Sequence, residues 1–121
     1  MHITERTIGD ITILDLQGKL TIGDGAEILR DKVASIVFQG QRKVLLNLAG
    51  VPYMDSGGLG ELVRCSMAAR KANGAVKLVS LTSRITDLLS ITKLLTVFDT
   101  FDSEEVALRS FGDIAATTPS A

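Results

Sequence analysis

An acidic side chain and a hydroxyl side chain stand next to each other in the segment Val51 to Val63, VPYMDSGGLGELV. Asp55 and Ser56 follow an apolar run, and glycines crowd the residues after them before an apolar pattern of helical spacing begins. A serine in such a place can act as a nucleophile, line a phosphate-binding loop, cap a helix or accept a phosphoryl group. The neighbouring residues discriminate between these chemistries.

Serine hydrolysis is disfavoured because no general base accompanies Ser56. A serine nucleophile needs a partner that removes its proton, and the single histidine of the chain, His2, stands at the N-terminus. The segment MDSGG also lacks the Gly-x-Ser-x-Gly arrangement that exposes a nucleophile on a strained turn. We therefore do not predict that Ser56 is a catalytic nucleophile.

A nucleotide or metal cofactor is not expected either. The loop SGGLGEL lacks the Gly-Lys-Ser/Thr ending that reaches nucleotide phosphates, and Glu61 puts a negative charge where a lysine would help. His2 and Cys65 are the only soft metal ligands, too few for a zinc cluster within one chain. On the helix that follows the motif, Cys65 is interpreted as a small core or boundary residue and not as a redox sensor.

Two roles of Ser56 stay open. As a helix N-cap, its oxygen would accept a hydrogen bond from an amide two or three residues on, which is worth roughly 1 kcal/mol. As a phosphoacceptor it would need only to be accessible, because a kinase supplies the machinery, and the phosphate would add about −1.5 to −2 charges. The helix end would favour that charge, whereas Asp55 and Glu61 would oppose it. The two roles are compatible.

The length and composition indicate one folded domain. The chain has 121 residues, enough for a single core, and its 45% hydrophobic and 22% charged residues are ordinary for a globular protein. We assign residues 1–112 to the domain and residues 113–121, which end in ATTPSA, to a flexible C-terminal tail.

Charge and hydropathy narrow the range of partners. The net charge is −1 and no run of Lys and Arg marks a phosphate-backbone footprint, so no nucleic-acid partner is expected. No apolar segment is long enough to span a bilayer, and the N-terminus lacks the features of a signal peptide. We expect a cytoplasmic protein without a membrane partner, as a monomer or weak dimer.

Strands and helices alternate along the chain. The dipeptide Gly9-Asp10 between two β-branched runs predicts a hairpin, and the compact apolar runs Val44–Leu48 and 75–80 predict inner strands. Helical spacing predicts helices over about 25–38, after Ser56, over 82–90, and after 103, and the segment TVFDTF predicts an edge strand. In the second helix, Leu59, Leu62 and Met67 mark the apolar face. This pattern predicts an α/β domain with a mixed, mainly parallel sheet of four to five strands and about four helices.

With these features in place, residues 3 to 111 resemble a STAS domain, the sulfate transporter and anti-sigma factor antagonist module, and specifically the small stand-alone bacterial antagonists. The resemblance rests on the order of elements and on an Asp-Ser-x-Gly-Leu-Gly motif after an apolar strand, formed by Asp55, Ser56, Gly57, Gly58, Leu59 and Gly60.

The resemblance implies a partner-switching protein and not an enzyme. In the family, the unphosphorylated antagonist binds an anti-sigma factor that is also a serine kinase, and a sigma factor is freed. Phosphorylation in the Asp-Ser motif breaks that complex, and a serine phosphatase restores it. The phosphorylation candidate here is Ser56.

Two departures from the family pattern keep a second function open. Many members carry another hydroxyl residue after the first and use it as the acceptor, whereas this chain has Gly57; Thr21 replaces an acidic residue, and Asp24 lies three positions on. The alternative is an adaptor or scaffold that is not phosphorylated. A docking rim around the motif is predicted from Thr21, Asp24, Tyr53 and Met54, with packing of Tyr53 and Met54 against the sheet as the other possibility.

Overall fold

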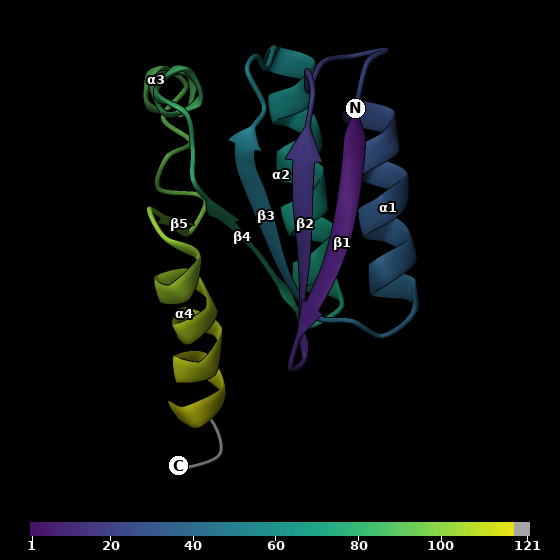
Figure 1. Cartoon of the computed structure of the whole chain (residues 1–121), viewed down its shortest axis with the longest axis vertical. Coiled ribbons are helices and arrows are strands. Elements are labelled where there is room, and N and C mark those ends of the chain that lie inside the picture. Colours follow the sequence, from purple (N-terminus) through teal and green to yellow (C-terminus); the bar gives the residue numbers. More distant parts are fainter. Residues whose placement is uncertain (118–121) are drawn as a thin grey trace.

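The computed structural model describes the backbone of residues 1–117 and the side chains of residues 1–111. Over this range five strands form one sheet in the spatial order β1-β2-β3-β4-β5, and four helices pack against it (Figure 1). The strands are β1 His2–Ile8, β2 Ile11–Gln17, β3 Lys43–Gly50, β4 Ala75–Val79 and β5 Thr100–Phe101. The helices are α1 Ala26–Phe38, α2 Ser56–Lys71, α3 Ser83–Ile91 and α4 Glu104–Thr117. β1 pairs with β2 antiparallel and the other neighbours are parallel, which confirms the predicted mixed, mainly parallel sheet.

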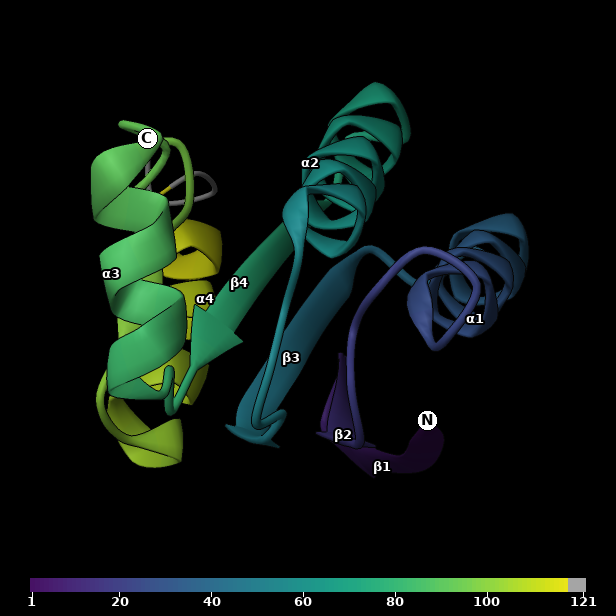
Figure 2. The ribbon, with the colours of Figure 1, turned by 90° about the horizontal axis from the view of Figure 1, so that it is seen from above.

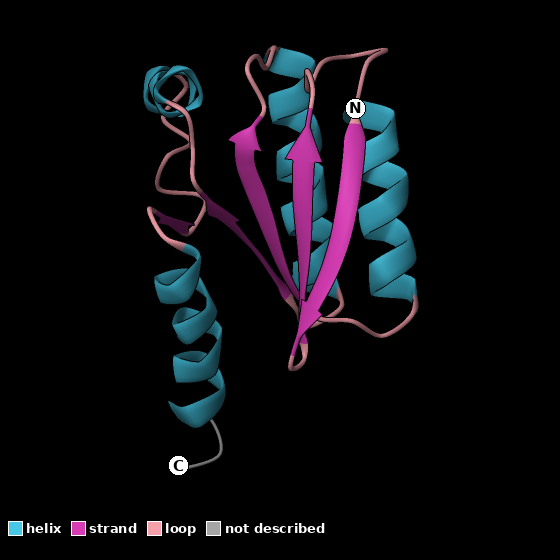
Figure 3. Ribbon diagram, in the orientation of Figure 1, coloured by secondary structure: helices cyan, strands magenta, loops and turns pink. Residues whose placement is uncertain are grey.

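The predicted hairpin joins the first two strands. Ile8 pairs with Ile11, and Gly9 turns the chain with a φ of 60°, a conformation that glycine adopts without steric cost. The following strands β3 and β4 are reached by helical crossovers, as parallel pairing requires. The carboxyl ends of β2 and β3 therefore lie at the same end of the sheet, at the top in Figure 3, where short loops lead into α1 and α2.

Alternating side chains of β2 and β3 build two cores, one on each face of the sheet. On one face, residues such as Leu14, Leu46 and Leu48 pack with α1, α2 and α3. On the other face, Ile13 and Leu45 pack with α4. Seen from above, α1 and α2 lie side by side on the same face of the sheet (Figure 2). Both inner strands are thus covered on both faces, which explains their continuous apolar runs.

Two expectations need correction. Met67 is 55% exposed, because the buried stripe of α2 runs through Leu62, Cys65 and Ala69 and position 67 falls outside it. The boundary predicted at residue 112 falls inside α4, which continues to Thr117, while residues 118–121 of the predicted tail lie outside the described residues. The flexibility of that tail stays a prediction.

Candidate functional site

The Asp-Ser motif forms the junction between β3 and α2. After β3 the buried Val51 and Met54 anchor the connecting segment, and Asp55 has the extended conformation of an N-cap. The Asp55 Oδ1 atom accepts a hydrogen bond from the Gly58 amide at 2.8 Å. Asp55, and not Ser56, therefore caps the helix, and Ser56 is its first helical residue. The predicted role of Ser56 as the N-cap is therefore wrong. Ser56 is exposed, and its hydroxyl does not cap the helix.

A glycine in the first turn of α2 lets the loop after β2 approach the helix closely. A Cβ atom on Gly58 would overlap the backbone carbonyl oxygen of Leu20. Leu20 is itself held by its amide, which donates to the Tyr53 carbonyl oxygen at 3.0 Å. The loop after β2 therefore lies directly against the first turn of α2, which begins at Ser56.

Gly57 is covered by a side chain from the same loop. A Cβ atom on Gly57 would overlap Cγ1 and Cδ1 of Ile22, a residue that is 74% exposed. An apolar side chain therefore lies over the position where many family members carry their second hydroxyl. Any residue larger than glycine at position 57 would have to displace Ile22.

The predicted docking rim is only partly at the surface. Tyr53 and Asp24 are exposed, and Tyr53 lies with its ring centroid 5.9 Å from the guanidinium carbon of Arg84. Thr21 and Asp24 close a turn through paired backbone hydrogen bonds of 2.9 and 3.0 Å. Met54, by contrast, is only 4% exposed, because it bridges to Leu20 beside the sheet and packs in the core. Met54 therefore does not belong to an exposed rim.

Ser56 lines a groove between α1 and α2, which we call the α1–α2 groove. It has a volume of about 210 Å³ and is open to solvent. Its charged and polar walls come from Glu27 and Arg30 of α1 and from Ser56, Glu61 and Arg64 of α2. The sequence analysis did not find Arg30 or Arg64, because their proximity to the motif follows from the packing of α1 on α2. Helical spacing alone could have placed Arg64 on the face of Ser56, two turns further along.

Glu61 is the buried charge of the groove. It is 4% exposed, and its carboxylate lies 3.7 Å from Nη1 of Arg64 and 4.0 Å from Sγ of Cys65. Burial, and to a lesser extent the charge of Glu61, raise the pKa of the Cys65 thiol to about 12. Cys65 is therefore a protonated core residue at neutral pH, which agrees with its interpretation from the sequence.

Within the described residues there is no cluster of three or more His, Cys, Asp or Glu side chains that could hold a metal ion. None of the helices in this part of the chain has the length and apolar character needed to cross a membrane.

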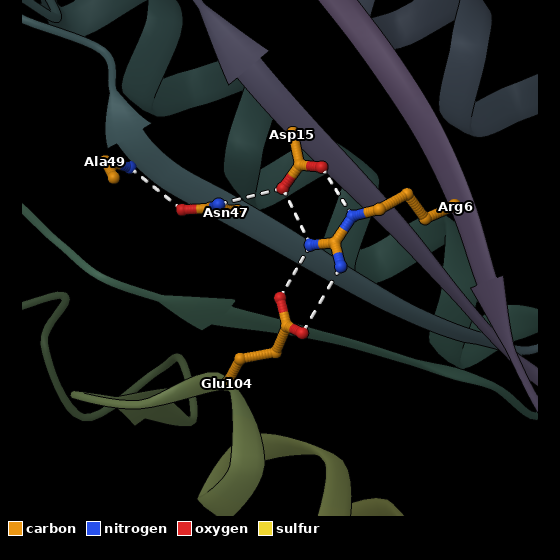
Figure 4. A network of polar contacts seen from close by, with 5 residues as sticks. All are labelled: Arg6, Asp15, Asn47, Ala49 and Glu104. Atoms are coloured by element: carbon orange, nitrogen blue, oxygen red, sulfur yellow. Dashed lines mark hydrogen bonds and ion pairs between the residues drawn. The ribbon is translucent and has the colours of Figure 1, made fainter.

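A second polar cluster lies on the α4 side of the sheet (Figure 4). Arg6 of β1 donates to both carboxylate oxygens of Asp15, at 2.6 and 3.0 Å, and to both of Glu104 at the start of α4, at 2.6 and 3.3 Å. Asn47 of β3 also donates to Asp15, at 2.8 Å. The hydrogen bonds from Arg6 hold the pKa of Asp15 below its usual value, against the effect of partial burial. This cluster ties β1, β2, β3 and α4 together, and the sequence analysis did not predict it.

The fold and the motif together define the class of protein. A five-stranded mixed sheet with four helices, and an Asp-Ser-Gly-Gly turn between β3 and α2, form a domain of the STAS type. A family model described as STAS domain matches residues 2–107. The chain therefore belongs to the STAS domain family.

Two relatives are named as anti-sigma factor antagonists. BtrV of Bordetella bronchiseptica, named as a candidate anti-sigma factor antagonist, is 29% identical over 111 residues, 92% of this chain and 95% of that protein. The anti-sigma-B factor antagonist of Bacillus subtilis is 36% identical over 74 residues, 61% of this chain and 67% of that protein. The solved structure of the Bacillus cell fate determinant SpoIIAA in its phosphorylated form has a TM-score of 0.69 at 19% identity, covering 90% of this chain and 99% of that chain. At this identity the structural likeness concerns the fold.

Proposed function

We propose that this protein is an anti-sigma factor antagonist that works by partner switching in the cytoplasm. In its unmodified form it binds an anti-sigma factor, itself a serine kinase, through the surface around the first turn of α2. Phosphorylation of Ser56 by that kinase releases the complex, and a serine phosphatase restores the binding form. The protein supplies a hydroxyl and a docking surface, and the kinase supplies the catalysis.

One observation carries this proposal: the capping role in α2 is taken by Asp55, so the exposed Ser56 hydroxyl is available at the end of the sheet where β3 meets the helix. A phosphoryl group there would add about −1.5 to −2 charges to a docking surface, next to the carboxylate of Asp55. Desolvating that charge in an interface is costly, so a phosphate can expel a partner without refolding the domain. The names of the relatives support the kind of partner.

The direct test uses the anti-sigma factor that co-purifies with the protein. The two are incubated with ATP, and the product is mapped by mass spectrometry. We expect one phosphate, on Ser56, and no incorporation into Ser56→Ala. A phosphate on another residue, or none at all, would refute the phosphorylation step.

The contact between Ile22 and Gly57 favours a second candidate function. Because Ile22 covers the position of the usual acceptor, the domain could keep the docking surface and bind its partner constitutively, as an adaptor. Affinities of Ser56→Ala and Ser56→Asp for the partner separate the two candidates. Partner switching predicts that only Ser56→Asp loses affinity, by tenfold or more, whereas an adaptor binds both equally.

Ser83 provides a matched control for this comparison. It is the exposed first residue of α3, which is capped by Thr82 just as α2 is capped by Asp55. The variant Ser83→Asp puts the same charge at the same helical position on another element. Under the partner-switching proposal Ser83→Asp binds the partner like the wild type. An equal loss of affinity in Ser56→Asp and Ser83→Asp would instead indicate a general effect of added negative charge.

A further inference from the structure

The α1–α2 groove holds two arginines whose charge is not fully used by the domain. Arg30 has its Nε atom 3.5 Å from Oδ1 of the adjacent Asp31, and Arg64 has its Nη1 atom 3.7 Å from Oε1 of Glu61, so both ion pairs are long. The two arginine side chains are 53% and 72% exposed. The Arg30 pair is exposed on both sides and contributes little to stability. The Arg64 pair joins an exposed guanidinium to a buried carboxylate over a long distance, so the guanidinium can also turn toward another anion.

Arg64 extends toward the N-terminus of α2 and thus toward Ser56. Its Nη1 atom lies 4.0 Å from the point where a Cβ of Gly60 would be. Gly60 is one helical turn after Ser56 on the same face, where neighbouring Cβ positions are about 5–6 Å apart. The missing side chain at position 60 leaves the path between the guanidinium and Ser56 open. A phosphate on Ser56 would enter the space that Arg64 already borders.

The acidic residues around this space set the balance of charge. Glu27 and Glu61 line the groove, and Asp55 precedes Ser56. Asp55 already accepts a hydrogen bond from the helix, and Glu61 is buried beside Cys65. Arg64 can therefore turn from its long contact with Glu61 to a phosphate, with which it can form the shorter, bidentate hydrogen bonds that guanidinium groups prefer. Arg30 supplies a second positive charge from the opposite wall.

We propose that the α1–α2 groove is the receptor for the phosphate of Ser56, with Arg64 as its hydrogen-bonding partner and Arg30 as the second cation. The proposal rests on the proposed function, because it concerns the fate of the same modification. Its consequence is a modified state in which the phosphate lies along the groove and links α2 to α1. The arginines are then withdrawn from the surface that the partner contacts.

The test installs phosphoserine at position 56 during translation, so it requires no kinase. The phosphate is titrated by phosphorus NMR in the full chain and in Arg64→Gln, Arg30→Gln and Arg70→Gln. Arg70 is an exposed residue near the end of α2, outside the groove, and serves as the matched control. A nearby guanidinium favours the doubly charged phosphate, so we expect the titration midpoint in Arg64→Gln to move up by roughly half to one pH unit. The shift in Arg30→Gln is in the same direction and smaller, and Arg70→Gln keeps the wild-type midpoint.

Equal midpoints in Arg64→Gln and Arg70→Gln would overturn the proposal, and so would a lower midpoint in Arg64→Gln. Because both arginines of the groove are exposed, their replacement leaves the fold intact, which is checked by the unfolding midpoint in urea. The outcome is independent of the kinase reaction. If the kinase does not phosphorylate Ser56, the partner switch is refuted, while the phosphate titration still tests the groove. If the titration midpoints do not differ, the groove proposal is refuted, while the kinase experiment still tests the partner switch.

Discussion

The polar cluster on the α4 side of the sheet and the α1–α2 groove use their charged residues differently. On the α4 side, Arg6 joins two carboxylates through four hydrogen bonds, and the buried Lys77 donates to Ser110 at 2.8 Å and lies 4.7 Å from the ring centroid of Phe111. These charges hold α4 on the sheet. On the α1–α2 side, Arg30 and Arg64 make only long contacts within their own helices.

This difference distinguishes charged residues that stabilise the fold from charged residues that can bind a partner. Charges that complete their hydrogen bonds within the domain stabilise it and offer little to a partner. Charges that remain exposed beside Ser56 add little to stability and are available to a phosphate or a binding protein. The positions that can be changed without unfolding the protein should therefore concentrate in the α1–α2 groove.

The largest effect is expected from Gly58→Ala, which tests whether backbone contact positions the α1–α2 side. The added Cβ would overlap the Leu20 carbonyl oxygen, and a packed backbone cannot move aside cheaply. We expect a loss of about 2–3 kcal/mol in the free energy of unfolding, measured by urea denaturation.

Gly57→Ala is the control for that variant, because its Cβ would meet the exposed side chain of Ile22, which can rotate away. Its loss should stay below about 1 kcal/mol, since alanine also favours the helix. Equal losses in the two variants would show that the loop is not held through the Leu20 contact.

On the α4 side, Arg6→Gln should destabilise the protein because it removes the centre of the polar cluster. Arg6 is 39% exposed, so solvent screening limits the expected loss to about 1 kcal/mol. Arg109→Gln, at an exposed position of α4, is the matched control and should change nothing measurable in the same denaturation experiment. Wild-type stability in both Arg6→Gln and Arg109→Gln would contradict a stabilising role of the polar cluster.

The pH dependence of stability gives a separate test of the α4 side. Because Arg6 lowers the pKa of Asp15 in the folded state, ionised Asp15 stabilises the fold above the unfolded pKa of about 4, and this contribution is lost as pH falls through the folded pKa. Asp15→Asn should therefore show a smaller loss of stability than the wild type between about pH 5 and pH 2. Asp87→Asn, at an exposed position of α3, should keep the wild-type slope. Identical slopes in all three proteins would contradict the account.

The smallest effect is expected from Arg64→Gln in the unphosphorylated protein. Arg64 is 72% exposed and its contact with the buried Glu61 is long, so the loss in the free energy of unfolding should be about 0.5 kcal/mol and smaller than that of Arg6→Gln. A loss as large as that of Arg6→Gln would remove the distinction between the two sides of the sheet.

Local patterns predicted most of the architecture. The Gly9-Asp10 turn, the apolar runs of the inner strands and the helical spacing after each strand were sufficient for the element order and the class of sheet. These patterns did not identify the N-cap of α2, because aspartate and serine are both good caps and stand next to each other. The structure decides between them, because Asp55 has an extended backbone and accepts the hydrogen bond from the Gly58 amide, so the helix begins at Ser56.

Long-range packing accounts for the features that the sequence did not predict. Arg6 and Glu104 are 98 positions apart, and Arg30 and Ser56 line the same groove only because α1 packs on α2. No local pattern encodes such contacts. Met54 shows the same limit, since alternation could not indicate that it bridges to Leu20 and becomes buried.

We propose the α1–α2 side of the sheet, and not the α4 side, as the docking surface. Amide hydrogen exchange of the protein, alone and bound to the anti-sigma factor that co-purifies with it, tests this most directly. We expect added protection in residues 20–25 and in the first two turns of α2, with no change in β1 or at the start of α4. Protection confined to β1 and α4 would contradict it.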